Sequence, residues 1–150
     1  TELYDHPVNA FVAGFIGSPA MNLFTVPVAS GGVQVGERLV ALERDQLTAI
    51  AAAGLDEVTL GLRPEQLEIG SAEDDGLLVQ VDLVEELGNE SYLYASFPDR
   101  EIRAIDGTSA TIVARSPQRA PARIGETVTL RKREGSAHVF HPETGDRLGA

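Results

Sequence analysis

The chain of 150 residues contains no cysteine, no tryptophan and a single lysine, Lys132. The absence of cysteine excludes disulfides, zinc–thiolate centres and thiol nucleophiles. No apolar run approaches the ~18 residues that a membrane-spanning helix needs. The lysine of a phosphate-binding loop stands in the pattern Gly-x-x-x-x-Gly-Lys-Ser/Thr, which occurs nowhere in this sequence. We therefore predict that this chain does not hydrolyse ATP by itself, and no catalytic residue is proposed.

Basic residues are also scarce, with 12 Lys and Arg against 23 Asp and Glu and a formal net charge of −11. A net-acidic chain is a poor partner for nucleic acid, because phosphate contacts supply most of that affinity. The 3 Tyr and 5 Phe also offer few stacking partners for bases. The basic residues gather in the last third of the chain, and we interpret them as complementing the acidic part within the fold or across a dimer. They include Arg115, Arg119, Arg123, Arg131, Lys132 and Arg133.

Short strand-like runs with turn signals between them dominate the chain after Asn22. This pattern favours a mainly β fold, an OB-like barrel with additional strands, a short N-terminal helix and one short internal helix. The internal helix is predicted over Asp45–Ala53, ending at Gly54. Val84 falls out of phase within its strand, which predicts a bulge. The predicted strands are Leu23–Val28, Val33–Val35, Arg38–Leu42, Glu57–Arg63, Leu77–Leu87, Ser91–Phe97, Thr111–Arg115, Glu126–Lys132 and Ala137–Phe140.

The first 22 residues have a different character, which predicts a helix and a linker ahead of a β domain at 23–150. Apolar residues recur with the period of one helix face, and Gly17-Ser18-Pro19 ends the pattern. The apolar stripe consists of Val8, Phe11, Val12, Phe15 and Ile16.

Four motifs in order along the chain resemble those of the ATP-binding subunits of ABC importers of the maltose/glycerol-phosphate type. They are the junction Tyr4–Asn22, the block Gly61-Leu62-Arg63-Pro64-Glu65, the turn Val84-Glu85-Glu86-Leu87-Gly88-Asn89-Glu90 and the closing segment His138–Leu148. One departure is His141, where the family usually has Asp. The connection Phe97–Thr108 carries no family motif.

The resemblance implies that residues 23–150 are the regulatory, transport-associated OB (TOBE) domain of such a subunit, without its nucleotide-binding domain. It implies a homodimer that is joined to its parent nucleotide-binding domain and, through it, to membrane permease subunits at the cytoplasmic face. A regulatory protein or a small effector would be a further partner. The parent would bind ATP and magnesium and serve the import of sugars, oligosaccharides or glycerol-phosphate esters; this fragment needs no cofactor.

The motifs also supply the candidate site residues. Arg63, Pro64 and Glu65 are interpreted as a strand exit held by a local ion pair, or as a contact with a partner. Gly88, Asn89 and Glu90 form either a structural turn or a contact with an effector or a neighbouring subunit.

The junction adds Phe11, Phe15, Met21 and Asn22 as candidates for packing on the missing domain or for self-association. His138 and His141 stand three apart in a strand pattern, so they should face opposite ways and not share a metal. The alternative function is a free-standing OB-type module that binds a small ligand or oxyanion near Arg131–Arg133.

Overall fold

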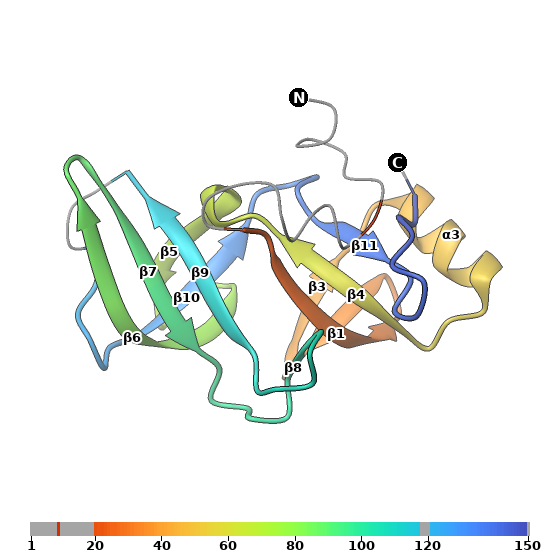
Figure 1. The fold of residues 1–150 in the computed structure, drawn as a ribbon, viewed down its shortest axis with the longest axis horizontal. Helices are drawn as coiled ribbons and strands as arrows, with labels where there is room; N and C mark the ends of the chain where they lie inside the picture. The colour runs from red at the N-terminus through yellow and green to blue at the C-terminus, as the bar shows by residue number, and fades with distance from the viewer. Residues whose placement is uncertain (1–8, 10–19, 118–120, 150) are drawn as a thin grey trace.

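The computed structural model of the protein describes residue 9 and residues 20–117 and 121–149. Two antiparallel sheets lie side by side along the long axis of the molecule (Figure 1). The first has six strands in the order β11-β4-β1-β2-β3, with β8 joined to β1, and the second has five in the order β5-β10-β6-β7-β9. The predicted mainly β, OB-like fold is confirmed, whereas the junction helix with Phe11 and Phe15 lies outside the described residues.

The first sheet contains β1 (Asn22–Ala29), β2 (Gly32–Val35), β3 (Arg38–Ala41), β4 (Glu57–Leu62), β8 (Arg103–Ala104) and β11 (His138–Phe140). The second contains β5 (Leu67–Ser71), β6 (Leu77–Leu87), β7 (Glu90–Ser96), β9 (Thr111–Ser116) and β10 (Thr127–Lys132). The helix α3 (Arg44–Ala53) and the 3-10 helix η1 (Pro64–Gln66) complete the described elements.

The helix α3 begins and ends where the sequence favours a helix boundary. At its first turn the Gln46 side chain accepts a hydrogen bond from the Glu43 backbone N–H at 2.9 Å. The same side chain donates to the Ala137 carbonyl at 2.8 Å, which holds the helix against the chain leading into β11. The helix ends at Gly54, as predicted, because a glycine C-cap takes the left-handed backbone at little steric cost.

The long strand β6 has the predicted bounds and the predicted irregularity. Its pairing with β7 shifts register between Val81 and Leu83, which confirms a bulge just before Val84. The bulge changes which side chains face the interior, so that Val81 is buried whereas Leu83 is exposed. The hairpin then closes through Gly88, whose φ of +71° suits a residue without a side chain.

Two strands were not predicted, β5 and β8. Pro64-Glu65-Gln66 forms the 3-10 helix η1 after β4, and the chain becomes extended again at once in β5. Leu67 and Ile69 alternate with Glu68 in β5, which pairs with β10. The strand β8 pairs only two residues with β1 and has no apolar alternation that could have revealed it.

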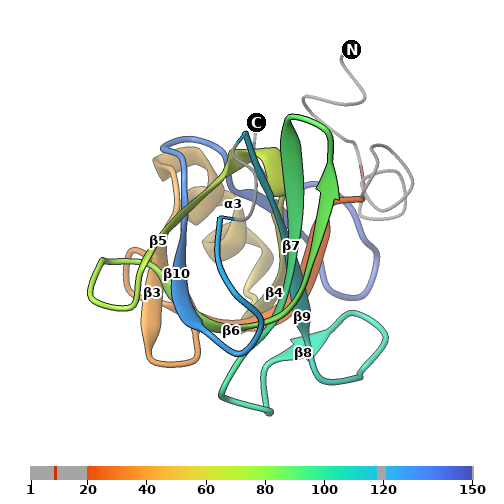
Figure 2. The same ribbon diagram turned by 90° about the vertical axis from the view of Figure 1, so that its left-hand side faces the viewer.

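Buried side chains from both sheets form one apolar cluster, so the two sheets share a single core. Phe24 of β1 and Phe97, just after β7, meet edge to face with ring centroids 5.6 Å apart. The second sheet curves, as its end-on view shows (Figure 2), and its edge strands β5 and β9 contact each other. No helix within the described ranges has both the length and the apolar character that a membrane crossing requires.

Candidate functional site at Glu65 and Glu90

Two candidate residues from separate motifs, Glu65 and Glu90, line one cavity of 600 Å³ in the second sheet. Its walls come from η1, β5, the start of β7, the end of β9 and the residue after β10. The fold therefore brings together two positions that the sequence had singled out independently. The lining residues are Glu65, Leu67, Glu68, Ile69, Glu90, Arg115, Ser116, Pro117, Pro121 and Arg133.

The described residues that line the cavity carry charges of both signs, with three carboxylates and two guanidinium groups. The Arg115 Nε donates to the Glu90 Oε2 at 2.8 Å, and these side chains are 45% and 34% exposed. Solvent screens such a pair, so it contributes at most about 1 kcal/mol to stability. The cavity is thus unsuited to an oxyanion and better suited to a group that offers both hydrogen-bond donors and acceptors.

Polar atoms are buried close to this cavity. Ser91 is fully buried and pairs in register with Ser116, which lines the cavity. Within the described part of the chain, neither the Ser91 Oγ nor the Gln66 Oε1 has a hydrogen-bond partner. Sequence reasoning missed Glu68 and Ser116, although the alternation of Leu67, Glu68 and Ile69 was a signal for the strand that holds Glu68.

The remaining residues of the two motifs are not among those that line this cavity. Arg63 is 2% exposed and is the largest fully buried side chain of the described residues, while Pro64, also buried, begins η1. Arg63 therefore lies in the interior and Glu65 at the cavity surface. Gly88 and Asn89 form the exposed tip of the β6–β7 hairpin, outside the cavity lining.

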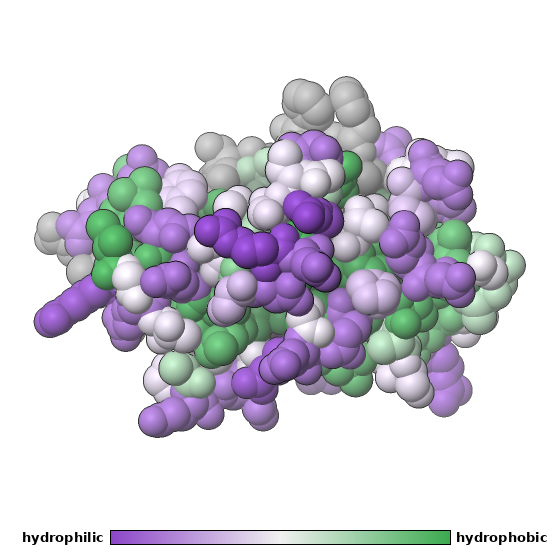
Figure 3. Space-filling model, turned by 90° about the horizontal axis from the view of Figure 1, so that it is seen from below, coloured by the Kyte–Doolittle hydropathy of each residue, from purple (hydrophilic) through white to green (hydrophobic). Residues whose placement is uncertain are grey.

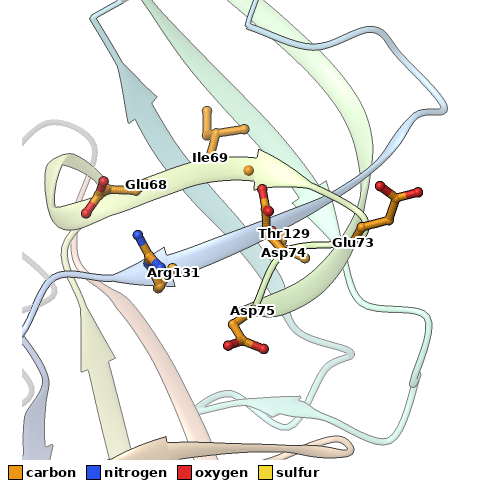
Figure 4. A pocket seen from close by; sticks show the side chains of 8 residues that line it. Glu68, Ile69, Glu73, Asp74, Asp75, Thr129 and Arg131 are labelled. Carbon is orange, nitrogen blue, oxygen red and sulfur yellow. The ribbon is translucent and has the colours of Figure 1, made fainter.

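A second cavity of 460 Å³ shares Glu68 and Ile69 with the first (Figure 4). Among the described residues, Glu68, Glu73, Asp74 and Asp75 line it together with one cation, Arg131. One of these carboxylates makes a hydrogen bond within its own loop, since the Asp74 Oδ2 accepts from the Ser71 backbone N–H at 2.8 Å. Across the ranges that the structure describes, no three His, Asp or Glu side chains are grouped so that they could hold a metal ion.

The junction candidates Met21 and Asn22 are both interior residues, at 5% and 8% exposure. Met21 packs with Phe140 against β4, where a Cβ on Gly61 would overlap the Met21 Sδ and come within 3.1 Å of the Phe140 Cε2. This close approach explains why the Gly-Leu-Arg-Pro-Glu motif begins with glycine.

Asn22 links the two sheets through hydrogen bonds from one side chain. Its Nδ2 donates to the carbonyl of Leu62 in β4 and to that of Val113 in β9, both at 2.9 Å. Its Oδ1 accepts from the Val113 N–H at 2.8 Å. The residue at the end of the junction is thereby bound to both sheets.

The closing motif contains the one clear departure from the family pattern, at His141. Its Nδ1 accepts hydrogen bonds from the backbone N–H groups of Glu143 at 3.1 Å and Thr144 at 3.3 Å. An aspartate oxygen makes the same bonds in a turn, so the ring nitrogen replaces it without loss of the turn. His138 is buried instead, with its Nδ1 3.0 Å from the Arg147 Nη1.

Two family profiles match the chain, the MalK OB fold domain over residues 17–67 and the TOBE domain over residues 60–140. The diacetylchitobiose uptake system ATP-binding protein MsiK of Streptomyces coelicolor is 40% identical over 97% of this chain and 41% of its own length. The sn-glycerol-3-phosphate import ATP-binding protein UgpC 3 of Agrobacterium fabrum is 41% identical over 93% of this chain and 36% of its own.

The lactose transport ATP-binding protein LacK of Rhizobium radiobacter is 40% identical over 85% of this chain and 34% of its own length. The chain thus spans 41% or less of the length of each of these three relatives. The chain belongs to the TOBE domain family, and its relatives are ATP-binding subunits of sugar and glycerol-phosphate ABC importers, of which it matches the C-terminal part.

Proposed function

We propose that this chain is the regulatory and dimer-stabilising domain of the ATP-binding subunit of an ABC importer for sugars, oligosaccharides or glycerol-phosphate esters. The observation that carries the proposal is the coverage of the match. MsiK aligns with 97% of this chain, yet the chain accounts for only 41% of MsiK. The nucleotide-binding domain, with ATP and magnesium, belongs to the remainder of such a subunit.

The position of Asn22 supports a role in transmitting motion. Asn22 ends the junction segment and binds the backbone of Leu62 in one sheet and Val113 in the other. The two sheets also share one apolar core. A body fastened in this way follows its point of attachment as a unit, which suits a domain that moves with a motor domain during an ATP cycle.

The proposed subunit works as a homodimer on the cytoplasmic face of the membrane, in contact with permease subunits through its motor domain. A regulatory protein or small effector would act on the exposed surfaces of the TOBE domain. The domain itself contributes no group to ATP hydrolysis, because the sequence has no phosphate-loop pattern.

Sedimentation equilibrium of the chain over a range of concentrations tests the dimer-stabilising part. We expect a reversible monomer–dimer equilibrium, with the average mass rising toward twice 16.0 kDa. A mass that stays at the monomer value at every concentration would contradict a dimer-stabilising role for this domain alone.

The charges around Arg131–Arg133 also bear on the alternative, a free-standing module for a small ligand or oxyanion. Arg131 lines a cavity with four carboxylates, and Arg133 lines one with three. Arg131 and Lys132 also line a third cavity, of 410 Å³, together with Arg38, Glu37 and Asp75. The positive surplus of this third lining is the observation that favours the alternative. Calorimetric titration with sugar phosphates, sulfate and molybdate separates the two functions. Saturable 1:1 binding of one of these compounds would favour the alternative. If the chain is the regulatory domain that we propose, we expect no measurable heat of binding from any of them.

A further inference from the structure

The outer face of the β6–β7 hairpin and β9 presents apolar side chains in register. Antiparallel neighbours share a face, so the pairing defines three rows across the strands. The first row is Leu83, Tyr94 and Val113, the second is Glu85, Tyr92 and Arg115, and the third is Leu87 and Glu90. We call these eight residues the hairpin face.

The exposure of this face is unusual within the molecule. Leu83 is 51% exposed and Leu87 is 46% exposed, on one strand and one side of it. The other large exposed apolar side chains of the described residues, Leu39, Ile105 and Ile124, come from separate segments. In the view from below, hydrophobic side chains form several separate groups among hydrophilic ones (Figure 3). Apolar side chains that recur in register mark an interaction surface better than scattered ones do.

Two exposed carboxylates, Asp82 and Glu85, lie on the same side of the sheet as the hairpin face. The Tyr94 hydroxyl donates to the Glu85 Oε1 at 3.3 Å, and the Ser96 hydroxyl donates to the Asp82 Oδ1, also at 3.3 Å. The guanidinium of Arg115 is already engaged with Glu90. The carboxylates of Asp82 and Glu85 therefore give this side of the sheet a negative surplus among the described residues, and a second copy of the face would bring the same carboxylates against it.

We propose that the hairpin face binds an amphipathic helix of a partner protein, with Lys or Arg beside its apolar stripe. A helix with one apolar stripe can bury that stripe against the apolar face of a sheet. Leucine side chains of such a helix would pack on Leu83, Leu87 and the tyrosine rings, while its cations would meet Asp82 and Glu85. The inference goes beyond the proposed function, which names no surface for a partner protein, and it rests only on the geometry and charge of this face.

The probe is a synthetic amphipathic helical peptide of Leu and Lys, titrated into the isotope-labelled chain while amide chemical shifts are recorded. We expect saturable shifts on β6, β7 and β9. The double variant Leu83→Ser, Leu87→Ser should weaken binding about tenfold or more. Asp82→Lys with Glu85→Lys should weaken it as well. Ile124→Ser, at a residue that is 67% exposed elsewhere, is the matched control and should bind as the parent does.

Several outcomes would overturn the inference. One is that the shifts map to the acidic loop at Glu73–Asp75, which would mean that the peptide binds through non-specific electrostatic attraction alone. Another is that a matched Leu/Glu peptide binds equally well, or that the Leu/Lys peptide does not bind at all. A third is that Leu83→Ser with Leu87→Ser abolishes self-association of the chain in sedimentation, so that a second copy occupies this face. A single Leu87→Ser variant repeats the test with less change to the surface.

Discussion

Asn22 and Val113, 91 residues apart in sequence, exchange two hydrogen bonds, one in each direction. The Asn22 side chain also donates to the Leu62 carbonyl, so one amide satisfies backbone groups of both sheets. Its burial at 8% exposure keeps water from replacing these bonds. The two sheets are therefore joined by a specific polar contact as well as by their common apolar core.

Replacing Asn22 by alanine should lower the free energy of unfolding by about 2–4 kcal/mol, because the partners on Leu62 and Val113 lose their bonds in a largely buried place. Asn22→Asp should be at least as harmful at neutral pH, since a carboxylate would face two carbonyl oxygens. Urea denaturation measures both. Gln80→Ala is the control, because the Gln80 side chain makes a long, exposed hydrogen bond of 3.5 Å to the Gly125 carbonyl. This substitution should change the free energy of unfolding by no more than about 0.5 kcal/mol. Equal stability of Asn22→Ala and the parent would refute the role of this contact.

A methyl group at Gly61 should destabilise the fold by about 1–3 kcal/mol, because it would overlap Met21 and crowd Phe140. The shortening of Met21 to alanine makes room for it. In the double variant Gly61→Ala, Met21→Ala the loss should therefore be smaller than the sum of the two single losses. Thermal or urea unfolding of the four proteins measures this coupling, and strict additivity would contradict the packing explanation of the motif.

His141 should be replaceable by aspartate with little change in stability at neutral pH, because both residues accept the backbone N–H groups of Glu143 and Thr144. His141→Ala removes the acceptor and should cost about 0.5–1.5 kcal/mol. Hydrogen exchange at the amides of Glu143 and Thr144 reports on the turn directly. Equal protection of these amides in His141→Ala and the parent would show that the ring nitrogen does not hold the turn.

The pKa of Asp106 lies below its ordinary value, chiefly because the Thr108 hydroxyl donates to its Oδ1 at 2.6 Å, and also because the Thr108 N–H donates at 3.0 Å. A lowered pKa means that this interaction stabilises the fold above the ordinary pKa and is lost as the pH falls through the lowered one. In Thr108→Val the hydroxyl bond is absent and the pKa should rise toward the ordinary value. NMR titration of the Asp106 carboxyl carbon measures it, and an unchanged pKa would assign the shift to another cause.

Much of the fold could be predicted because its signals are local. Alternation located β1, β4 and β6, the out-of-phase Val84 indicated the bulge, and Gly54 marked the end of α3. The strand β5 was missed because it follows a proline-led turn, and β8 because its pairing with β1 depends on tertiary contacts. Local patterns do not carry such long-range pairing.

The candidate site was predictable only in part. Glu65 and Glu90 came from motifs, but their common cavity results from the packing of η1, β5 and β9, which no local pattern encodes. Arg63 illustrates the same limit, since a charged residue beside a proline gives no sign that it will be 2% exposed. The role of Asn22 likewise depends on Val113, which is distant in sequence.

Reading the coding DNA upstream of the codon for Thr1 tests the proposed function at its root. We expect an in-frame Gly-x-x-x-x-Gly-Lys-Ser/Thr phosphate loop, followed by a signature resembling Leu-Ser-Gly-Gly-Gln, ahead of this domain. A start codon next to Thr1, with no such motifs in frame, would contradict the assignment to an importer's ATP-binding subunit and favour a free-standing module.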